Sequence, residues 1–428
     1  MASEERDIKA QAQVQYTASD IARLQNGTTV YRSRLVNTGS VAQHLSMKKT
    51  DKLLRAQRDH EVLRIVVFLL ALLVLVFFSL CFTGAQGQWY PYSSMYAFYT
   101  PIEVGNALYL NAWDAIASAT HAFEPHTKAW IAENCSCYWA VFERLQVVGV
   151  TLICAILLSI SGVLYQNVFA NPIAGPGMLG ASSGVSLGMM LLVALYGSQA
   201  LSMVNERYIF CYGLGAAILV FVILAGKKLS GRGKPFDIVT MLLIGSILGQ
   251  LIGFVVSYMT LFVMDADDYQ TFFTMSQMLT IDTSATSWIT LGIVSLISIV
   301  PVYLLRFKFN VLSLSEEEAR LSGVNMTRLR AVALIAGAIM MLAAQIHTGA
   351  VGMITLLAPF IARGLFGCEM SKQLTGSVLV GMPLLLICRD ITDCIPFVGN
   401  GLAIGSVVSI VAVPLFILIV TRGMKGWE

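Results

Sequence analysis

The sequence has few charged residues for its length. Only 12% of its 428 residues are Asp, Glu, Lys or Arg, whereas about a quarter of the residues of an ordinary globular domain are charged. Hydrophobic residues make up 56% of the chain, and the mean hydropathy is +0.72. The net charge of +3 is too small to indicate a nucleic acid partner. This composition excludes an ordinary globular protein and predicts a polytopic membrane protein.

The motifs of nucleotide-driven and hydrolytic enzymes are also missing. A phosphate-binding loop needs Gly-x-x-x-x-Gly-Lys followed by Ser or Thr. The nearest segments, Gly226-Lys227-Lys228 and Gly233-Lys234-Pro235, lack both the earlier glycine and the hydroxyl. There is no His-Glu-x-x-His, no Gly-x-Ser-x-Gly and no close carboxylate pair within an apolar run. We therefore expect no enzyme activity in this chain and no cofactor bound by it.

The eight cysteines form no recognisable disulfide framework. Cys135 and Cys137 lie in a polar segment with His121 and His126, which makes these four side chains weak candidates for ligands of haem or iron. Cys-x-Cys with two distant histidines matches no metal spacing well. We therefore favour surface histidines and a disulfide from Cys135 or Cys137, with Cys394 or Cys81 as its partner.

Apolar runs long enough to cross a bilayer recur along the chain and predict about ten transmembrane helices. They cover residues 65–83, 146–168, 178–198, 209–226, 238–263, 287–305, 329–347, 350–366, 376–392 and 402–420. An even number of spans places both termini on one side. With both termini in the cytoplasm, the only basic residues left outside or near the outer face are Lys128, Arg144, Arg207 and Arg389, as the positive-inside rule requires.

The spans divide the chain into a membrane domain and its appendages. Residues 1–64 are polar and mixed in charge, and we interpret them as a cytoplasmic extension. Residues 65–421 are the ten-helix domain, and 422–428 are a cytoplasmic tail. Residues 84–143, rich in Trp and Tyr, form an enlarged external cap that packs or lies at the interface.

A helix break lies between the second and third runs. Asn171-Pro172 and Pro176 end one helix and start another, because proline lacks a backbone donor and disfavours helix at the residue before it. Gly180, Gly184 and Gly188 then recur every four residues. This spacing leaves one face of the next helix open to close approach by another helix.

The stretch from Gly162 to Val185 resembles the signature of the FecCD-type permeases, the membrane subunits of ABC importers for ferric siderophores, haem and cobalamin. The pattern is G-x-x-x-Q-x-x-x-x-N-P-L-A-x-P-x-x-L-G-x-x-x-G-A, and only its first Leu (here Ile173) and last Ala (here Val185) differ. The matching positions include Gly162, Gln166, Pro172, Pro176, Gly180 and Gly184.

A second resemblance lies between the sixth and seventh runs. Ser315 with Glu318 is typical of a capping box, and Gly323 suits a helix C-terminus, so a short amphipathic helix is expected. The family pattern matches here as well, which implies coupling helices within 309–327 that contact an ATPase. The residues implied as ATPase contacts are Glu317, Ala319, Arg320 and Gly323.

The resemblance continues less closely toward the C-terminus. Gly349 to Arg363 is similar to a family motif, with Phe360 in place of its usual His. Asp390 matches a family Asp and lies next to Arg389, so we expect an ion pair between these two neighbours. The resemblance implies docking of a substrate-binding protein through Arg144, although the family's other two arginines fall on Val147 and Cys394.

The resemblance implies a type II ABC importer permease fold in the bacterial cytoplasmic membrane. It implies a second permease copy or paralogue, two ATPase subunits that bind ATP and Mg, an extracellular binding protein and alternating access. A cytoplasmic gate would include Asn171, Ile173, Asp237 and Thr240. The expected substrate is a ferric siderophore or haem. The alternatives are a cobalamin permease, or a membrane sensor or channel that retains the fold.

Overall fold

The computed structural model describes residues 61–84, 96–98, 101–120, 138–229, 238–277, 283–313, 324–394 and 403–423. The chain divides into two units, Met1–Arg64 and Ile65–Glu428. Nearly all of the predicted N-terminal extension lies outside the described residues. The account below concerns the second unit.

The second unit is built from helices, as the composition predicts. Eight of the described helices are long and apolar enough to cross a membrane, and the shorter apolar helices Met353–Phe366 and Ile404–Ile417 bring the total to the expected ten. Besides helix Glu61–Cys81, the long apolar helices are α6 (Tyr138–Val168), α7 (Ala181–Tyr196), α8 (Val204–Leu229), α9 (Ile238–Phe262), α11 (Ala285–Phe309), α13 (Met326–Thr348) and α15 (Met370–Cys394). Helix α16 (Ile404–Gly423) contains the shorter apolar segment, and α4 (Pro101–Thr120) is not a candidate span. The short ones are η1 (Pro176–Leu179), η2 (Gly197–Leu201), α10 (Ala266–Gln277), η3 (Asn310–Ser313) and α14 (Met353–Phe366).

Helix α6 is the centre of the packing. In its most apolar stretch 78% of the residues are buried, against 6% in helix Glu61–Cys81. Both sequences are apolar all round, so burial is decided by position rather than by composition. Helix α6 packs against α13, α14 and α15. The first helix exposes Leu73, Val74 and most of its other apolar side chains, as expected of a helix that faces lipid.

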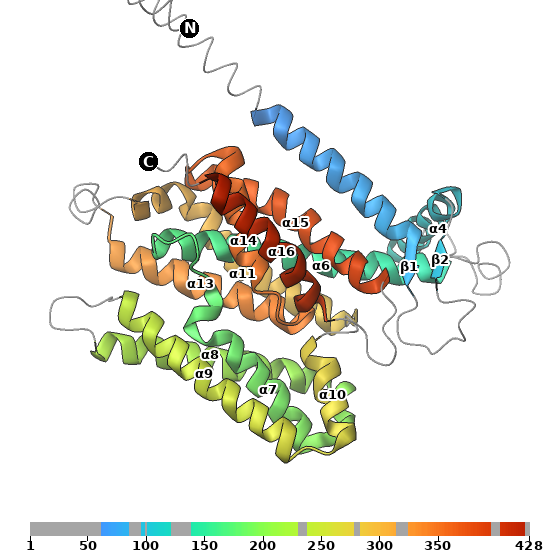
Figure 1. Cartoon of the computed structure of the whole chain (residues 1–428). Helices are drawn as coiled ribbons and strands as arrows, with labels where there is room; N and C mark the ends of the chain where they lie inside the picture. The colour runs from blue at the N-terminus through green and yellow to red at the C-terminus, as the bar shows by residue number, and fades with distance from the viewer. Residues whose placement is uncertain are drawn as a thin grey trace, which may run out of the picture. The chain divides into compact units, whose positions relative to one another are not determined.

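Helices α7, α8 and α9 form a group of their own, drawn in green and yellow-green beside the orange and red helices in Figure 1. Glycines allow the close approach. A Cβ on Gly184 would lie 2.7 Å from the Cα of Gly215 on α8, and one on Gly188 would lie 2.9 Å from the Cα of Cys211. Side chains at these positions would push the helices apart.

The predicted cap contains elements that the sequence did not predict. Strands β1 (Phe82–Gly84) and β2 (Tyr96–Phe98) pair antiparallel, with Phe82 opposite Phe98, so the chain is not purely helical. Helix α4 packs on α6 through Val104 and Ala107. Helix α10, between α9 and α11, was also not predicted. This helix is short and contains many polar residues, so it does not stand out as an apolar run in the sequence.

Candidate functional site

The helix break at Asn171 is a built turn at the end of α6, which we call the elbow (residues 169–180). The Oδ1 atom of Asn171 accepts a hydrogen bond of 2.9 Å from the backbone N of Ile173, the pattern of an Asx turn. Ala170 has a left-handed φ of 47°, which costs a non-glycine residue about 1–2 kcal/mol. Pro176 opens η1, and Gly180 ends it with a left-handed φ of 74°. These residues reverse the chain within the membrane domain.

The elbow is fixed to α9 by another glycine contact. Leu179 is fully buried, and a Cβ on Gly245 of α9 would lie 2.7 Å from its Cα. Two other elbow side chains remain outside the packing, because Ile173 is 51% exposed and Met178 is 38% exposed. The elbow therefore presents an apolar edge next to the start of α9.

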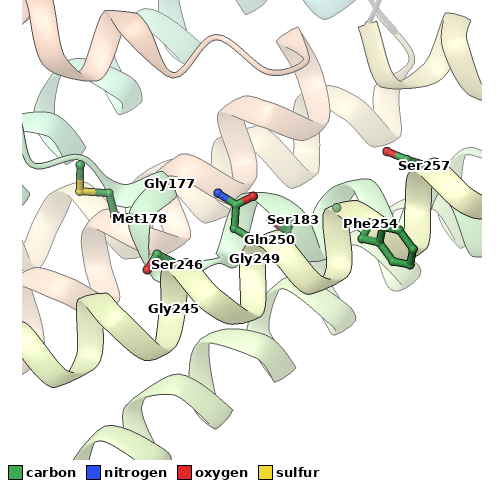
Figure 2. Close-up of a pocket in the computed structure, with 10 residues that line it drawn as sticks. Gly177, Met178, Ser183, Gly245, Ser246, Gly249, Gln250, Phe254 and Ser257 are labelled. Carbon is green, nitrogen blue, oxygen red and sulfur yellow. The ribbon is translucent and has the colours of Figure 1, made fainter.

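A groove of about 650 Å³ runs along α9 from this elbow. Figure 2 shows Met178 near one end, Gln250 in the middle, and Phe254 and Ser257 toward the other end. The full lining is Gly177, Met178, Ser183, Gly245, Ser246, Gly249, Gln250, Gly253, Phe254 and Ser257. None of these side chains carries a charge.

The polar side of this groove does not suit contact with lipid. Ser246, Gln250 and Ser257 are exposed on α9, a helix apolar enough to span a membrane. The Ser246 hydroxyl donates to the carbonyl of Leu243 in the same helix over 3.0 Å, so the side chains of Gln250 and Ser257 are the ones that lack a partner among the described residues. An amide or hydroxyl without a partner costs about 2–7 kcal/mol when it is moved from water into an apolar medium. The groove is therefore suited to face water, a ligand or another protein chain.

The two family-like motifs on α6 and α14 meet at a single joint. Pro359 lies inside α14 and has no N–H, so it leaves the carbonyl of Thr355 without its helical donor. A Cβ on Gly162 of α6 would collide with this same carbonyl oxygen and would lie 2.9 Å from the Cγ of Pro359. Glycine at 162 thus lets α6 rest directly on the proline-interrupted turn of α14.

Gln166 lies one turn further along α6 and contributes a hydrogen bond to this joint. Its Nε2 donates to the carbonyl of Leu356 over 3.1 Å, and the side chain is buried. Its Oε1 has no partner among the described residues. The side-chain amide of Gln166 therefore binds α14 through its NH2 group, as a hydrogen-bond donor.

Replacing Gln166 by leucine should destabilise the folded protein by about 1 kcal/mol, because the hydrogen bond between the Gln166 side chain and the Leu356 carbonyl is lost, while the removal of an unpaired amide oxygen offsets part of the cost. Thermal unfolding of the purified protein in detergent would measure the loss. Gln250→Leu is the matched control, since Gln250 is exposed in the groove. Equal melting temperatures for Q166L and the unmodified protein would show that the bond contributes nothing to stability.

The structure places part of the predicted cytoplasmic gate and leaves the rest outside the described residues. Asn171 and Ile173 lie on the elbow, and Thr240 lies half-buried in the first turn of α9. Asp237 is not among the described residues, nor are any of the predicted ATPase contacts, Glu317, Ala319, Arg320 and Gly323. The gate and the ATPase contacts thus remain predictions.

The segments that flank the predicted coupling helices are anchored in the membrane domain. The Oδ1 atom of Asn310 accepts a 2.8 Å hydrogen bond from the backbone N of Met370 at the start of α15. Phe309 and Leu312 are buried. After the segment, Asn325 caps α13 by accepting a bond from the backbone N of Arg328. The chain on either side of the predicted coupling helices is thus attached to α13 and α15.

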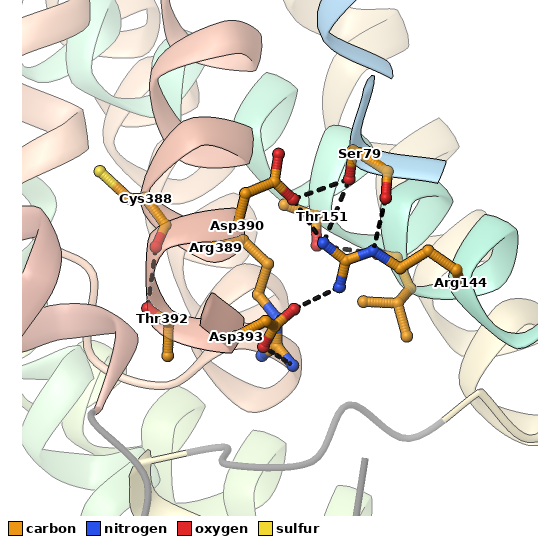
Figure 3. A network of polar contacts seen from close by, with 9 residues as sticks. Ser79, Arg144, Thr151, Cys388, Arg389, Asp390, Thr392 and Asp393 are labelled. Atoms are coloured by element: carbon orange, nitrogen blue, oxygen red, sulfur yellow. Dashed lines mark hydrogen bonds and ion pairs between the residues drawn. The ribbon is translucent and has the colours of Figure 1, made fainter. Parts of the chain in front are cut away.

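The expected ion pair between the neighbours Arg389 and Asp390 is wrong. Arg389 instead pairs with Asp393, one turn further along α15, at 2.9 Å. Asp390 pairs with Arg144 of α6, which also pairs with Asp393 (Figure 3). Adjacent helical residues point in different directions, whereas residues four apart lie on one face.

Arg144 therefore has internal partners. Its side chain is 4% exposed, and docking of a binding protein through Arg144 stays a prediction. Cys81, one of the two disulfide partners considered above, is a free, buried thiol. Among the described residues no group of His, Cys, Asp and Glu could hold a metal ion. The candidates His121, His126, Cys135 and Cys137 lie outside them.

A buried polar cluster on three helices was missed by sequence reasoning. The hydroxyl of Tyr208 on α8 lies 2.9 Å from Oγ of Ser287 on α11 and 3.1 Å from Nε2 of His347 on α13. The Nδ1 of His347 lies 2.7 Å from the carbonyl of Ala343. Since a carbonyl only accepts, Nδ1 carries a proton. The three residues are far apart in sequence, so no local pattern could indicate this cluster.

Known proteins resemble this chain in sequence and in fold. Residues 107–422 match the model of the FecCD transport family. The solved structure of "a putative metal-chelate type ABC transporter" in an inward-facing conformation shares the fold, with a TM-score of 0.58, 20% identity, and coverage of 75% of this chain and 99% of that one.

Curated relatives are similar along most of their length. A "Probable iron chelatin transport system permease protein" of Helicobacter pylori is 28% identical, covering 66% of this chain and 82% of the relative. The Fe(3+) dicitrate transport system permease protein FecC of Escherichia coli is 29% identical, covering 62% and 77%. The hemin transport system permease protein HmuU of Yersinia pestis is 26% identical, covering 68% and 86%. With a family match over most of its length and ten apolar helices among the described residues, this chain belongs to the FecCD transport family, the multi-pass permeases of the bacterial cytoplasmic membrane.

Proposed function

We propose that this chain is the permease subunit of an ABC importer that moves an iron complex, a ferric siderophore or haem, into the cytoplasm. The observation that carries the proposal is the uncharged groove between the elbow, α7 and α9, within a chain of the FecCD family. The named functions of its relatives, which include iron chelatin, Fe(3+) dicitrate and hemin transport, support the substrate class.

The groove suits passage of a large ligand rather than tight binding. Its hydrogen-bonding groups are the hydroxyls of serines and one amide, separated by glycines. With no charged side chain among its lining residues, the groove offers no strong electrostatic trap, so a complex that enters can also leave. Weak sites along a path are what conduction requires.

Movement through the groove needs partners in this proposal. A second permease copy or paralogue covers the open side of α9, two ATPase subunits bind ATP and Mg and push on the segment between η3 and α13, and an extracellular binding protein delivers the substrate. The elbow and its glycine contacts let the α7–α9 group tilt relative to α6, as alternating access requires.

The test is uptake by proteoliposomes that contain this chain, the ABC ATPase that co-purifies with it, and the binding protein. Radiolabelled ferric dicitrate, a ferric hydroxamate, hemin and cobalamin are supplied one at a time. We expect an iron complex to accumulate only when ATP is present on the side of the membrane that carries the ATPase. Accumulation should stop when the ATPase carries a phosphate-loop Lys→Ala substitution. Uptake of cobalamin alone, or equal flux with the inactive ATPase, would contradict the proposal.

A further inference from the structure

Five residues near the ends of three helices form one buried polar cluster, which we call the outer clamp. Its members are Ser79, Arg144, Arg389, Asp390 and Asp393 (Figure 3). They come from helix Glu61–Cys81, from α6 and from α15. The positive-inside distribution of charges assigns this end of the helices to the outer face.

Every nitrogen of the Arg144 guanidinium is used inside the protein. Its Nε donates to the backbone carbonyl of Ser79 over 3.2 Å, and Nη2 donates to the Ser79 hydroxyl over 3.2 Å. Nη2 also contacts Asp390, and Nη1 contacts Asp393. A single side chain thus connects three helices, and its planar fork fits two carboxylates at once.

The clamp is balanced in charge and completed by two further bonds. The hydroxyl of Ser79 donates to Oδ1 of Asp390 over 2.7 Å, so it links the first helix to α15 as well as to α6. The Nε of Arg389 donates to Oδ2 of Asp393 over 3.0 Å. Two arginines and two aspartates cancel, which is the condition under which buried charges are tolerated in a membrane protein.

Helix Glu61–Cys81 is mostly exposed, and its other printed contacts with the core are apolar. Only 6% of its most apolar stretch is buried. Toward its start, Ile65 and Phe68 pack against an apolar cluster that includes Phe366. Toward its end, Leu80 and Cys81 belong to a second apolar cluster. In lipid, apolar contact gives little attraction between helices, because the lipid tails are equally apolar. Polar bonds therefore carry more of the attachment here than they would in a soluble protein.

We propose that the outer clamp fastens helix Glu61–Cys81, and strand β1 that follows it, to the α6–α15 pair. Arg144 is a positioning residue that acts inside the chain and does not itself contact a binding protein. When the clamp is broken, the outer end of helix Glu61–Cys81 separates from the core while the core keeps its fold.

Cys81 provides a reporter at the right place. Its thiol is free and 3% exposed, two residues from Ser79. The full-length chain in membranes, with Cys135, Cys137 and Cys394 replaced by serine, is treated from outside with a membrane-impermeant maleimide. Modification is read at each cysteine by mass spectrometry. Cys154, which is fully buried in α6, reports unfolding of the core.

We expect Arg144→Gln to raise the labelling rate of Cys81 by about tenfold, because local opening exposes a protected group in proportion to its population. Asp390→Asn should do the same, and Ser79→Ala should have a smaller effect, since the Ser79 carbonyl still accepts from Arg144. In the double variant R144Q/D390N, loss of one charge of each sign restores neutrality, so Cys81 should be labelled more slowly than in R144Q. Cys154 should stay unlabelled throughout.

Two outcomes would overturn the proposal. The first is a Cys81 that stays protected in R144Q and D390N, which shows that the clamp does not hold the helix. The second is weaker capture of the binding protein by R144Q but not by D390N, with Cys81 still protected, which places Arg144 at a docking surface. If R144Q does not accumulate in membranes, D390N and S79A decide the same question.

Discussion

Replacing Gly253 by tryptophan should reduce uptake by about tenfold or more, because an indole of this size fills a large part of the groove. Gly253 lines the groove on α9, and a Cβ built there meets no atom within 4 Å. The substitution can therefore be accommodated by the folded chain while it obstructs the path. The measurement is ATP-dependent uptake of the labelled iron complex by proteoliposomes.

Gly213→Trp is the matched control. Gly213 lies within the membrane helix α8, is also exposed, has the same open space around a built Cβ, and is not part of the groove lining. Its uptake should stay close to that of the unmodified chain. The amount of each variant in the membrane, and its co-purification with the ATPase, must be unchanged. Normal uptake by G253W would mean that the substrate does not pass along this face of α9.

Replacing Gly162 by valine should destabilise the fold by about 3 kcal/mol, the upper part of the range for overpacked cores. The new side chain would collide with the backbone carbonyl of Thr355 and with the ring of Pro359. Neither obstacle is the free end of a flexible side chain, so neither can move aside cheaply. We expect a lower yield of folded protein and a lower melting temperature in detergent.

Gly364 supplies the control for this prediction. It lies in α14 near Pro359, is exposed, and has no atom within 4 Å of a built Cβ. Gly364→Val should leave the fold intact, and Gly364→Ala should stabilise α14 by up to about 1 kcal/mol, because alanine is the better helix former. Equal stability of G162V and G364V would refute the account of the joint between α6 and α14.

The helix break at Asn171 illustrates what local sequence can predict. Asn, Pro and Gly act on the backbone within a few residues of themselves, so the turn with Asn171, Pro176 and Gly180 could be located without a structure. The ten apolar runs were equally readable, since each is long enough to cross a membrane by itself. Helix α10 was missed because it is short and polar.

Contacts between distant segments could not be predicted in this way. The nearest acid to Arg389 along the chain is Asp390, and adjacency suggested that they pair. In the fold, Asp390 faces Arg144 while Arg389 faces Asp393. The same holds for Gly162, whose partner Thr355 lies on α14. Family resemblance indicated that these positions matter but did not say what they touch.

The sequence by itself determined that this is a polytopic membrane protein of about ten helices, broken at the elbow and lacking a nucleotide-binding loop. Hydropathy, helix length and proline chemistry act locally, and so they are legible in a single chain. Only the tertiary structure decided that Arg144 faces inward, that Gly162 rests on the turn before Pro359, and that Ser246, Gln250 and Ser257 line one groove. These facts depend on which helix faces meet, and that is set by packing between segments far apart in the sequence.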